Sequence, residues 1–474
     1  MSDEPVVDTK IIVQELITKG RVAMEEIKNY TQAQANTLVQ AVAWAIYQQE
    51  HAEELARISI RDTGLGNYED KVIKNKRKTF GTLRDLLDQE AKSVGVINVD
   101  QAKGITEIAK PVGIVAAIVP STNPGATPAN IAMMALKGRN AIIIAPSPKG
   151  ASTTDKLLEY IHAELTKIGA PVNLVQALPT PVSKESTGEL MKQANIVTVT
   201  GSGNNVRLGQ TCGTPNVCVS AGNVVSVVDA TADLQEAAHR IMLSKTFDNA
   251  TSCSSDNAVV IEAVVYDQMI EALKKEGGYF CNAEEKVQMH KAMWDENGKR
   301  KGATTAKSAE VMAAEARLTS VEAKKAKFFM VEETEVGKAF PFSGEKLSLV
   351  LTVYKVENFE EALGMTKRIL NFVGRGHSCG LHTNDESHIE RIGYEMDVCR
   401  LLINQVQCFG NGGNFNNGLN FTLSMGGGTW AGNNIKENLS YKHFINITKV
   451  SRVIPEVVPS EVELFESYWT KYGR

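Results

Sequence analysis

The sequence contains no C-x-x-C pair, no large excess of either charge, and no apolar run near the roughly 20 residues that span a bilayer. Its seven cysteines form an odd number, so we expect reduced thiols, no disulfide framework, no structural zinc site and no other metal. The net charge of -4, with both signs interspersed, offers no basic face for nucleic acid and no polybasic tract for a membrane surface. The first residues lack the pattern of a signal peptide. We therefore expect a cytoplasmic protein whose partners are small molecules or further copies of itself.

What the sequence does contain is the patterning of an α/β protein with two or more domains. The 474 residues are 43% hydrophobic and 22% charged. Residues 10–92 repeat apolar side chains with a period near 3.6 and carry no proline, which predicts helices. From about residue 105, short β-branched runs alternate with helical stretches, which predicts parallel sheets covered by helices, with a second domain from about residue 257. The expected strands are 112–119, 140–145, 172–177, 195–200, 224–229, 257–265, 347–356 and 377–383.

Two glycines stand between an expected strand and an expected helix in VTVTGSGNNVRLG, residues 197–209. In that context the backbone N–H groups of Gly201 and Gly203 can meet a phosphate at a helix N-terminus. The third glycine of the dinucleotide-binding fingerprint is absent, because Val206 stands in its place. An ordinary tight turn explains the glycines about equally well, so this motif alone does not decide the function.

A proline-rich turn, VPSTNPGATP, follows the expected strand at 112–119. Its prolines at 120, 124 and 128 fix an irregular backbone and present Asn123. The side-chain NH₂ group of Asn123 can donate to an oxyanion that develops during a reaction. The alternative is that Asn123 only closes the turn.

Cys253 lies in SKTFDNATSCSS, residues 244–255, ahead of an apolar strand-like run. A free cysteine taken alone is more often a small buried hydrophobic side chain than a nucleophile. Here the neighbouring Thr251, Ser252, Ser254 and Ser255 are too polar for a core segment. Exposed backbone N–H groups at such a turn would also stabilise a thiolate. The context therefore weakens the packing interpretation and favours a nucleophile.

Five stretches, in this order, resemble the aldehyde dehydrogenase superfamily, and specifically its acylating, coenzyme A-dependent branch. They are PVGIVAAIVPSTNPGATP, LKGRNAIIIAPSPKGA, SKTFDNATSCSS, GRGHSCGLHTND and GGGTWAGNNIKENLSYKHFINITKV. The resemblance covers nearly the whole chain. It implies an α/β fold with a Rossmann-type cofactor-binding domain at 1–225, a catalytic domain at 226–430, and a C-terminal return and oligomerisation segment at 431–474. Residues 98–110 would belong to the same oligomerisation element, in a homodimer or a homotetramer.

The resemblance also implies roles for individual residues. Cys253 would attack the aldehyde, and the side chain of Asn123 and the backbone N–H of Cys253 would hold the oxyanion. His377, in GRGHSC, would assist deprotonation of the thiol or hold the cofactor, with a structural role as the alternative. After hydride transfer to NAD(P)⁺, the thioester on Cys253 would pass to the thiol of coenzyme A. The residues expected to bind the nicotinamide cofactor are Pro120, Ser121, Thr122, Pro146, Ser147, Lys149, Thr200, Gly201, Ser202, Gly222 and Phe342.

Three departures from the hydrolytic members of the family bear on the reaction. Val219 stands where those enzymes carry a water-activating glutamate, so water is not the expected acyl acceptor. Ala145 and Pro148 replace a lysine and a glutamate that grip the adenosine ribose. Without that carboxylate a 2′-phosphate is not repelled and Lys149 can pair with it, so NADP⁺ or NAD⁺ is expected. Phe340 falls where a glutamate often binds the nicotinamide ribose, so no carboxylate is expected there.

Within this branch, residues 120–151 and 246–255 are most similar to acylating sulfoacetaldehyde dehydrogenases and less so to coenzyme A-dependent succinate-semialdehyde dehydrogenases. A small anionic aldehyde is therefore the implied substrate, with acetaldehyde or propanal as the uncharged alternative. Candidates for binding the anion are the hydroxyl side chains around Cys253, the loop at 409–418, Arg375 and Arg400. Two alternatives stay open: an inactive structural relative, which is not an enzyme, and, within enzymes, a thiol-dependent acyltransferase without a redox step.

Overall fold

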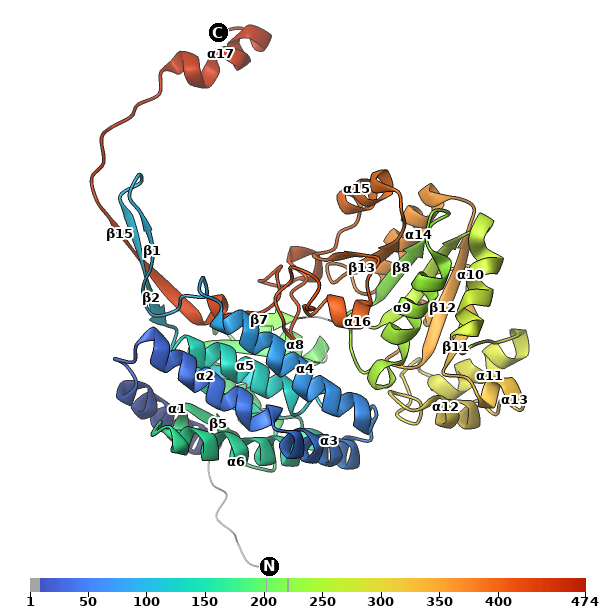
Figure 1. Ribbon diagram of the computed structural model, residues 1–474, viewed down its shortest axis with the longest axis horizontal. Coiled ribbons are helices and arrows are strands. Elements are labelled where there is room, and N and C mark those ends of the chain that lie inside the picture. The colour runs from blue at the N-terminus through green and yellow to red at the C-terminus, as the bar shows by residue number, and fades with distance from the viewer. Residues whose placement is uncertain (1–8, 202, 220) are drawn as a thin grey trace, which may run out of the picture.

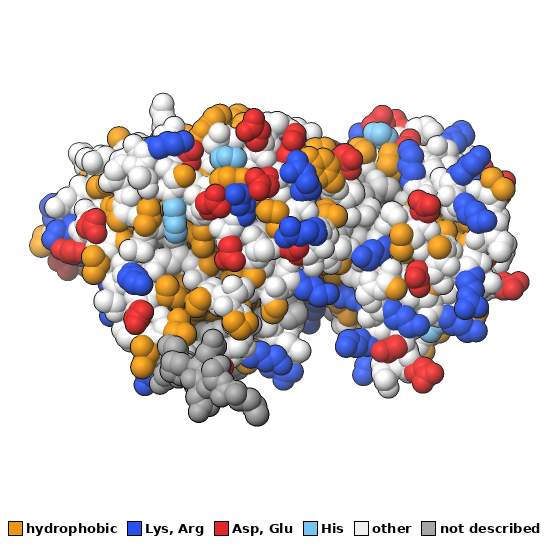
Figure 2. Space-filling view, turned by 90° about the horizontal axis from the view of Figure 1, so that it is seen from below, with side chains coloured by type: hydrophobic (Ala, Val, Ile, Leu, Met, Phe, Trp, Pro, Cys, Tyr) orange, Lys and Arg blue, Asp and Glu red, His pale blue; other side chains and the backbone are white. Residues whose placement is uncertain are grey.

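The computed structural model of the protein describes residues 9–201, 203–219 and 221–474. Three sheets organise these residues into two lobes and a projecting arm (Figure 1). Figure 2 shows basic and acidic side chains interspersed on one face of the molecule, whose outline is hollowed between the lobes. Across the described ranges, no helix combines the length and the apolar character needed to cross a membrane.

The N-terminal part of the chain forms four helices, as the apolar spacing predicts. They are α1 (Thr9–Glu26), α2 (Gln32–Tyr47), α3 (Gln49–Thr63) and α4 (Tyr68–Leu87). A capping box at Thr31 begins α2, which then packs against α5 (Ala126–Lys137) and α6 (Ala151–Lys167) of the first lobe. Unusually for a surface helix, α4 buries Lys71, Lys74 and Lys78. This helix therefore brings positive charge into the interior.

The first lobe is built on a five-stranded parallel sheet in the order β5-β4-β3-β6-β7. Its strands are β3 (Ile114–Ile118), β4 (Ala141–Ala145), β5 (Val175–Ala177), β6 (Ile196–Thr200) and β7 (Asn216–Val219). Its helices are α5 (Ala126–Lys137), α6 (Ala151–Lys167), α7 (Lys184–Gln193) and α8 (Gly203–Thr211). Every residue of β3 and β4 is buried, which is typical of a parallel sheet covered on both faces. The expected alternation of strands and helices is confirmed.

The second lobe is built on a seven-stranded parallel sheet in the order β10-β11-β12-β9-β8-β13-β14. Its strands are β8 (Val224–Val228), β9 (Asp256–Glu262), β10 (Gly278–Phe280), β11 (Phe328–Glu332), β12 (Val350–Val356), β13 (Cys379–His382) and β14 (Leu401–Ile403). Its helices are α9 (Leu234–Thr246), α10 (Ala263–Lys275), α11 (Ala283–Met293), α12 (Ala309–Glu315), α13 (Val321–Lys324), α14 (Phe359–Phe372), α15 (Glu386–Glu395) and α16 (Gln407–Gly410). The strand expected at 257–265 ends earlier, because α10 begins at Ala263.

The chain passes from the first lobe to the second and later returns. It leaves between the end of β7 at Val219 and the start of β8 at Val224, so the expected boundary at 225 falls just inside β8. After β14 it comes back, since Ile435, Leu439 and Phe444 belong to the hydrophobic core of the first lobe. Two connections therefore join the lobes.

The arm is a three-stranded antiparallel sheet in the order β1-β2-β15. It combines β1 (Gly95–Asp100) and β2 (Ile105–Pro111), which follow the N-terminal helices, with β15 (Ile445–Ser451) near the other end of the chain. Beyond β15 the chain extends to α17 (Glu461–Tyr472), which buries none of its residues and lies far from both lobes in Figure 1.

Candidate active site

A cavity of about 490 Å³ is lined by residues of both lobes. It lies at the carboxyl ends of β3, β4 and β6, where open parallel sheets bind their ligands. The turn that precedes β9 forms another part of its wall. The predicted site residues that line it are Pro120, Ser121, Thr122, Asn123, Ser147, Thr200, Gly201 and Cys253. The structure thus brings together the proline-rich turn, the glycine turn and the cysteine turn.

Cys253 lies on a strained turn between the 3₁₀ helix Phe247–Ala250 and β9. Asp248, Asn249 and Ala250 have φ angles of 50°, 50° and 57°, in the left-handed region that costs roughly 1 kcal/mol or more for a residue such as alanine. The turn is anchored because the buried Asp248 carboxylate pairs with Lys71 and Lys74 of α4. Cys253 itself is partly exposed at the cavity rather than packed in a core, as a nucleophile requires.

His377 supplies the nearest basic group to the thiol. Its Nε2 lies 3.5 Å from the Sγ of Cys253, and its Nδ1 lies 2.7 Å from the Oγ of Ser378. Burial, together with the neighbouring Arg400, lowers the pKa of His377 to about 3, so the imidazole is neutral at pH 7. Burial, together with Glu345, raises the pKa of the Cys253 thiol to about 12. The resting pair is therefore a neutral thiol beside a neutral imidazole.

The side chain of Asn123 is oriented by a buried lysine. The Nζ of Lys74 donates to the Oδ1 of Asn123 at 2.9 Å and to the Oγ1 of Thr251 at 2.9 Å, and it pairs with Asp248. Burial raises the pKa of Asp248, but Lys74 and Lys71 outweigh burial and hold it below its usual value, so the carboxylate is ionised. Because the Oδ1 of Asn123 is engaged by Lys74, its Nδ2 is left to donate to a ligand in the cavity.

Four described residues that were expected to bind the cofactor are not on the cavity wall: Pro146, Lys149, Gly222 and Phe342. Pro146 is buried beneath it, and Lys149 is exposed in the 3₁₀ turn before α6. The structure does not bring Phe342 to the cavity, because this residue is 1% exposed and packs in the core of the second lobe. Its ring lies edge-on to the ring of Trp294, with 4.9 Å between the ring centroids. The prediction for Ser202 lies outside the described residues.

Gly222 lies directly behind the nucleophile. A Cβ atom at this position would lie 2.1 Å from the carbonyl oxygen of Cys253 and 3.1 Å from the Nε2 of His377. No side chain fits there unless the turn moves. Gly222 therefore shapes the nucleophile turn, whereas the sequence predicted a contact with the cofactor.

No carboxylate was expected at Phe340, but one does lie on the cavity wall, that of Glu345. Its Oε2 lies 3.7 Å from the Nη1 of Arg300, which also lines the cavity. Burial raises the pKa of Glu345 to about 7, against the opposing effect of Arg300. Phe340, which sequence comparison placed at the glutamate position, lies five residues earlier in the chain and is not part of the wall. Val219 does line the cavity, as predicted for the position of a missing water-activating base.

The two arginines suggested for an anionic substrate do not line the cavity. Arg375 lies on the surface and pairs with Asp397, and Arg400 is buried with its Nη2 donating to two backbone carbonyl oxygens at 2.7 Å. The cavity wall contains Lys78 instead, which sequence reasoning missed. The sequence feature that could have identified Lys78 is the spacing of the lysines at 71, 74 and 78, which places them on one face of a helix. The hydroxyl residues Thr251, Ser252 and Ser254 also line the cavity, as does Gly412 from the expected loop.

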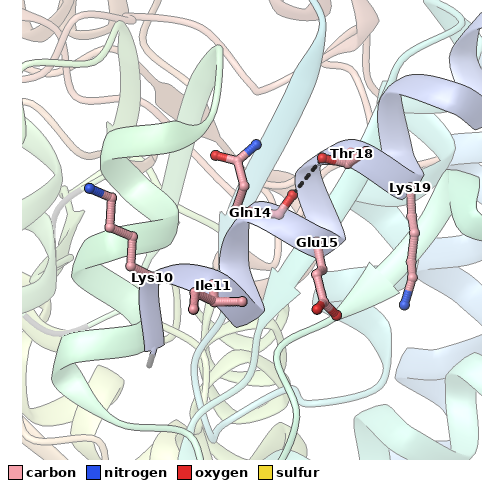
Figure 3. A pocket seen from close by; sticks show the side chains of 6 residues that line it. All are labelled: Lys10, Ile11, Gln14, Glu15, Thr18 and Lys19. Carbon is pink, nitrogen blue, oxygen red and sulfur yellow. Dashed lines mark hydrogen bonds between the residues drawn. The ribbon is translucent and has the colours of Figure 1, made fainter. Parts of the chain in front are cut away.

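A second hollow, of about 410 Å³, lies against α1. It is lined by Lys10, Ile11, Gln14, Glu15, Thr18 and Lys19 (Figure 3). All six side chains come from one helix, and the hydrogen bond drawn among them joins Thr18 to the carbonyl oxygen of Gln14 within that helix. The six include no cysteine and no histidine. We therefore place the candidate active site at the cavity that contains Cys253.

Comparisons with known proteins agree with this geometry. The sequence model described as "Aldehyde dehydrogenase family" matches residues 7–420. The chain is 48% identical to an acylating sulfoacetaldehyde dehydrogenase of Cupriavidus necator, over 98% of this chain and 93% of that protein. It is 34% identical to an acetylating succinate-semialdehyde dehydrogenase of Clostridium kluyveri, over 97% and 99%. An acetylating aldehyde dehydrogenase from Geobacillus thermoglucosidasius superposes with a TM-score of 0.91 at 32% identity, over 97% and 100%. The chain belongs to the aldehyde dehydrogenase family.

Proposed function

We propose that this chain is a coenzyme A-acylating sulfoacetaldehyde dehydrogenase. It converts sulfoacetaldehyde, coenzyme A and NAD(P)⁺ into sulfoacetyl-coenzyme A, NAD(P)H and a proton, in a reversible reaction. One observation carries the proposal: Cys253, a neutral imidazole and an oriented amide share a site in which the apolar Val219 stands at the position of the water-activating base. The similarity to acylating relatives supports both the reaction and the substrate.

Cys253 makes the first bond of the reaction. Its sulfur adds to the aldehyde carbon, and the Nε2 of His377 receives the thiol proton as the sulfur acquires negative charge. Because both groups are neutral at rest, the thiolate and the imidazolium form together and stabilise each other. Proton transfer is therefore coupled to attack on the substrate rather than completed beforehand.

The thiohemiacetal places negative charge on the former aldehyde oxygen. The Nδ2 of Asn123 and the backbone N–H of Cys253 donate to this oxygen, and a single donor of this kind contributes about 10²- to 10³-fold to the rate. Lys74 holds the amide in the required orientation from its other side. Transfer of hydride from the former aldehyde carbon to the oxidised nicotinamide that would bind here would leave a thioester on Cys253.

The residues at the carboxyl ends of β4 and β6 fit a nicotinamide dinucleotide. The Oγ of Ser147 is buried without a hydrogen-bond partner among the described residues, and Cβ atoms built at Gly201 and Gly203 would meet nothing closer than 4.0 Å. A spare hydroxyl and open backbone before α8 suit a phosphate, and Glu345 suits the nicotinamide ribose. When bound, the nicotinamide supplies the hydride acceptor. The exposed Lys149 is compatible with NADP⁺ or NAD⁺.

The thiol of coenzyme A takes the acyl group from Cys253. Its sulfur bonds to the carbonyl carbon of the thioester, the bond to Cys253 breaks, and the Cys253 thiol is restored. With aldehyde and NAD(P)⁺ but no coenzyme A, we expect a burst of NAD(P)H close to one per active site and little free acid. Steady formation of acid at nearly the full rate would refute acyl transfer to coenzyme A.

The substrate is tested by comparing aldehydes under saturating coenzyme A and following the absorbance of NAD(P)H. We expect kcat/KM to be about 10²-fold higher for sulfoacetaldehyde than for propanal, which has a similar length and no charge. Equal use of propanal would refute the sulfonate assignment. Succinate semialdehyde is the second candidate, supported by the 34% identical relative, and a preference for it would change only the substrate's name. Failure to form NAD(P)H with any aldehyde would favour an inactive relative or an acyltransferase.

We also propose that the protein is a homodimer or a homotetramer. The arm exposes large apolar side chains, among them Val96, Val99 and Ile447 at 48–56%. The segment beyond it exposes Val457, Val458 and others to a greater extent, and α17 has no packing partner among the described residues. Light scattering of the full chain should give two or four times the mass of 51.5 kDa. A monomer at micromolar concentration would refute this proposal.

A further inference from the structure

One face of α4 carries more positive charge than the interior around it neutralises. Lys71, Lys74 and Lys78 are buried, and Arg77 is half-buried beside them. A single carboxylate, that of Asp248, pairs with this face, and it is shared by Lys71 and Lys74. Within the described parts of the chain, no acidic oxygen lies within 4.0 Å of a nitrogen of Lys78 or Arg77. Lys78 and Arg77 therefore have no anionic partner among the described residues.

Of these two cations, Lys78 is the better placed to bind a ligand. Its side chain is 7% exposed and lines the same cavity as Cys253. One of its three N–H bonds is used, donating to the backbone carbonyl oxygen of Gly412 at 2.8 Å. Burial lowers the pKa of Lys78 to about 7, with Arg77 and Lys74 adding to the effect and the Cys408 and Cys253 thiols opposing it. An anion beside Lys78 would restore the charged state that burial disfavours.

Arg77 extends this positive region into an adjoining recess. The recess holds about 20 Å³, enough for one water molecule, and shares Lys78, Asn123 and Ser252 with the main cavity. The guanidinium of Arg77 lies 5.2 Å from the rings of both Phe409 and Phe415, and its Nη2 donates to the side chain of Asn414. Its Nε is buried and has no hydrogen-bond partner in the described structure. Arg77 therefore has a donor atom from which no described group accepts a hydrogen bond.

We propose that Lys78, assisted by Arg77, binds the anionic tail of the aldehyde and sets the preference for a sulfonated over an uncharged substrate. This inference rests on the proposed function, because it assigns the tail of that same substrate. A buried cation without a counter-ion is unfavourable, and an anionic substrate removes this penalty on binding whereas propanal does not. The hydroxyl groups of Ser252 and Ser254 on the same wall can supply further donors to the sulfonate oxygens.

The test compares Lys78→Gln, Arg77→Met and the control Lys76→Met in the full-length enzyme. Glutamine keeps a donor for the carbonyl of Gly412 and removes the charge, while Lys76 lies on the same helix and donates to Gln49 at the exposed surface. We expect Lys78→Gln to lower the ratio of kcat/KM for sulfoacetaldehyde to kcat/KM for propanal about 10²-fold, and Arg77→Met to lower it about tenfold. Lys76→Met should leave both substrates unchanged. Circular dichroism and melting curves show whether each variant is folded.

A second measurement separates this inference from the proposed substrate. With propanal as the reporter substrate, ethanesulfonate should compete with it in the wild-type enzyme, and Lys78→Gln should raise the inhibition constant at least about 30-fold. If the wild-type enzyme prefers sulfoacetaldehyde but Lys78→Gln keeps that preference, the inference fails and the proposed function stands. If sulfoacetaldehyde is a poor substrate while ethanesulfonate inhibits through Lys78, the anion site stands and the substrate assignment fails. Absence of inhibition, or equal inhibition of the variant, overturns the inference.

Discussion

Replacing Lys74 by methionine should slow the chemical step although Lys74 does not touch the substrate in the proposed mechanism. Its ammonium group donates to the Oδ1 of Asn123 at 2.9 Å and so leaves the Nδ2 directed to the cavity. A hydrogen bond to a charged group contributes about 1.5–3 kcal/mol. If that amount is lost from the transition state, kcat for propanal falls about 10- to 100-fold. Propanal is the substrate of choice because it has no charge, so a change in anion binding does not enter the result.

Lys71→Met is the matched control. Lys71 pairs with the same carboxylate of Asp248 at 2.7 Å but donates to a backbone carbonyl rather than to the Asn123 side chain. We expect this variant to lose stability while keeping kcat within about threefold. Melting curves of both variants would show whether they are destabilised to a similar extent.

A double-mutant cycle decides whether Lys74 acts through Asn123. Asn123→Ala alone should lower kcat about 10²- to 10³-fold. Adding Lys74→Met to Asn123→Ala should then cost much less than Lys74→Met costs in the wild-type enzyme, since the amide to be oriented is gone. Additive losses, or an equal loss in Lys71→Met, would refute the positioning role of Lys74.

Three further predictions concern the cavity wall. Cys253→Ala should remove turnover by about 10⁴-fold or more while circular dichroism stays unchanged, and substantial remaining activity would exclude Cys253 as the nucleophile. Gly222→Ala should lower kcat at least about 10²-fold without unfolding the protein, because the new Cβ would lie 2.1 Å from the carbonyl oxygen of Cys253; a rate near that of the wild type would contradict this packing. Glu345, with its pKa raised to about 7, is protonated below that pH, so the KM for NAD(P)⁺ should rise as pH falls from 8 to 6, and Glu345→Gln should make the KM independent of pH over this range. A pH dependence that persists in Glu345→Gln would assign the titration to another group.

Much of the fold could be predicted from local patterns in the sequence. The apolar spacing of residues 10–92 indicated helices, and α1 to α4 occupy that region. The β-branched runs at 112–119 and 140–145 indicated buried strands, and they contain β3 and β4. These predictions succeeded because the order of apolar and polar side chains within each element shows which of its faces is buried. The ends of the strands were predicted less accurately. For example, β9 ends at Glu262, because α10 begins at the next residue, Ala263.

The site was only partly predictable, because several of its contacts depend on tertiary packing. Cys253 and Asn123 stood out through their local context, and both line the cavity. Lys78 did not stand out, since a lysine in a helix usually faces solvent. Its burial depends on tertiary contacts such as the one with Gly412, which lies far away in the sequence. Glu345 was missed because an alignment by motif alone, without the structure, placed Phe340 at its position.

The contact between α4 and the cysteine turn has a consequence for how the enzyme loses activity. Asn123 belongs to one lobe and Cys253 to the other, and the ion pairs of Asp248 with Lys71 and Lys74 clamp the two together. Turnover therefore requires the two lobes to be in contact, whereas the far-ultraviolet circular dichroism signal depends only on the helices within each lobe. In rising urea we expect activity to vanish before the helical signal declines, because separating the lobes exposes less surface than melting either one. High salt should only slightly widen the difference between the urea concentrations at which activity and the helical signal are lost, since these ion pairs are buried and poorly screened by salt.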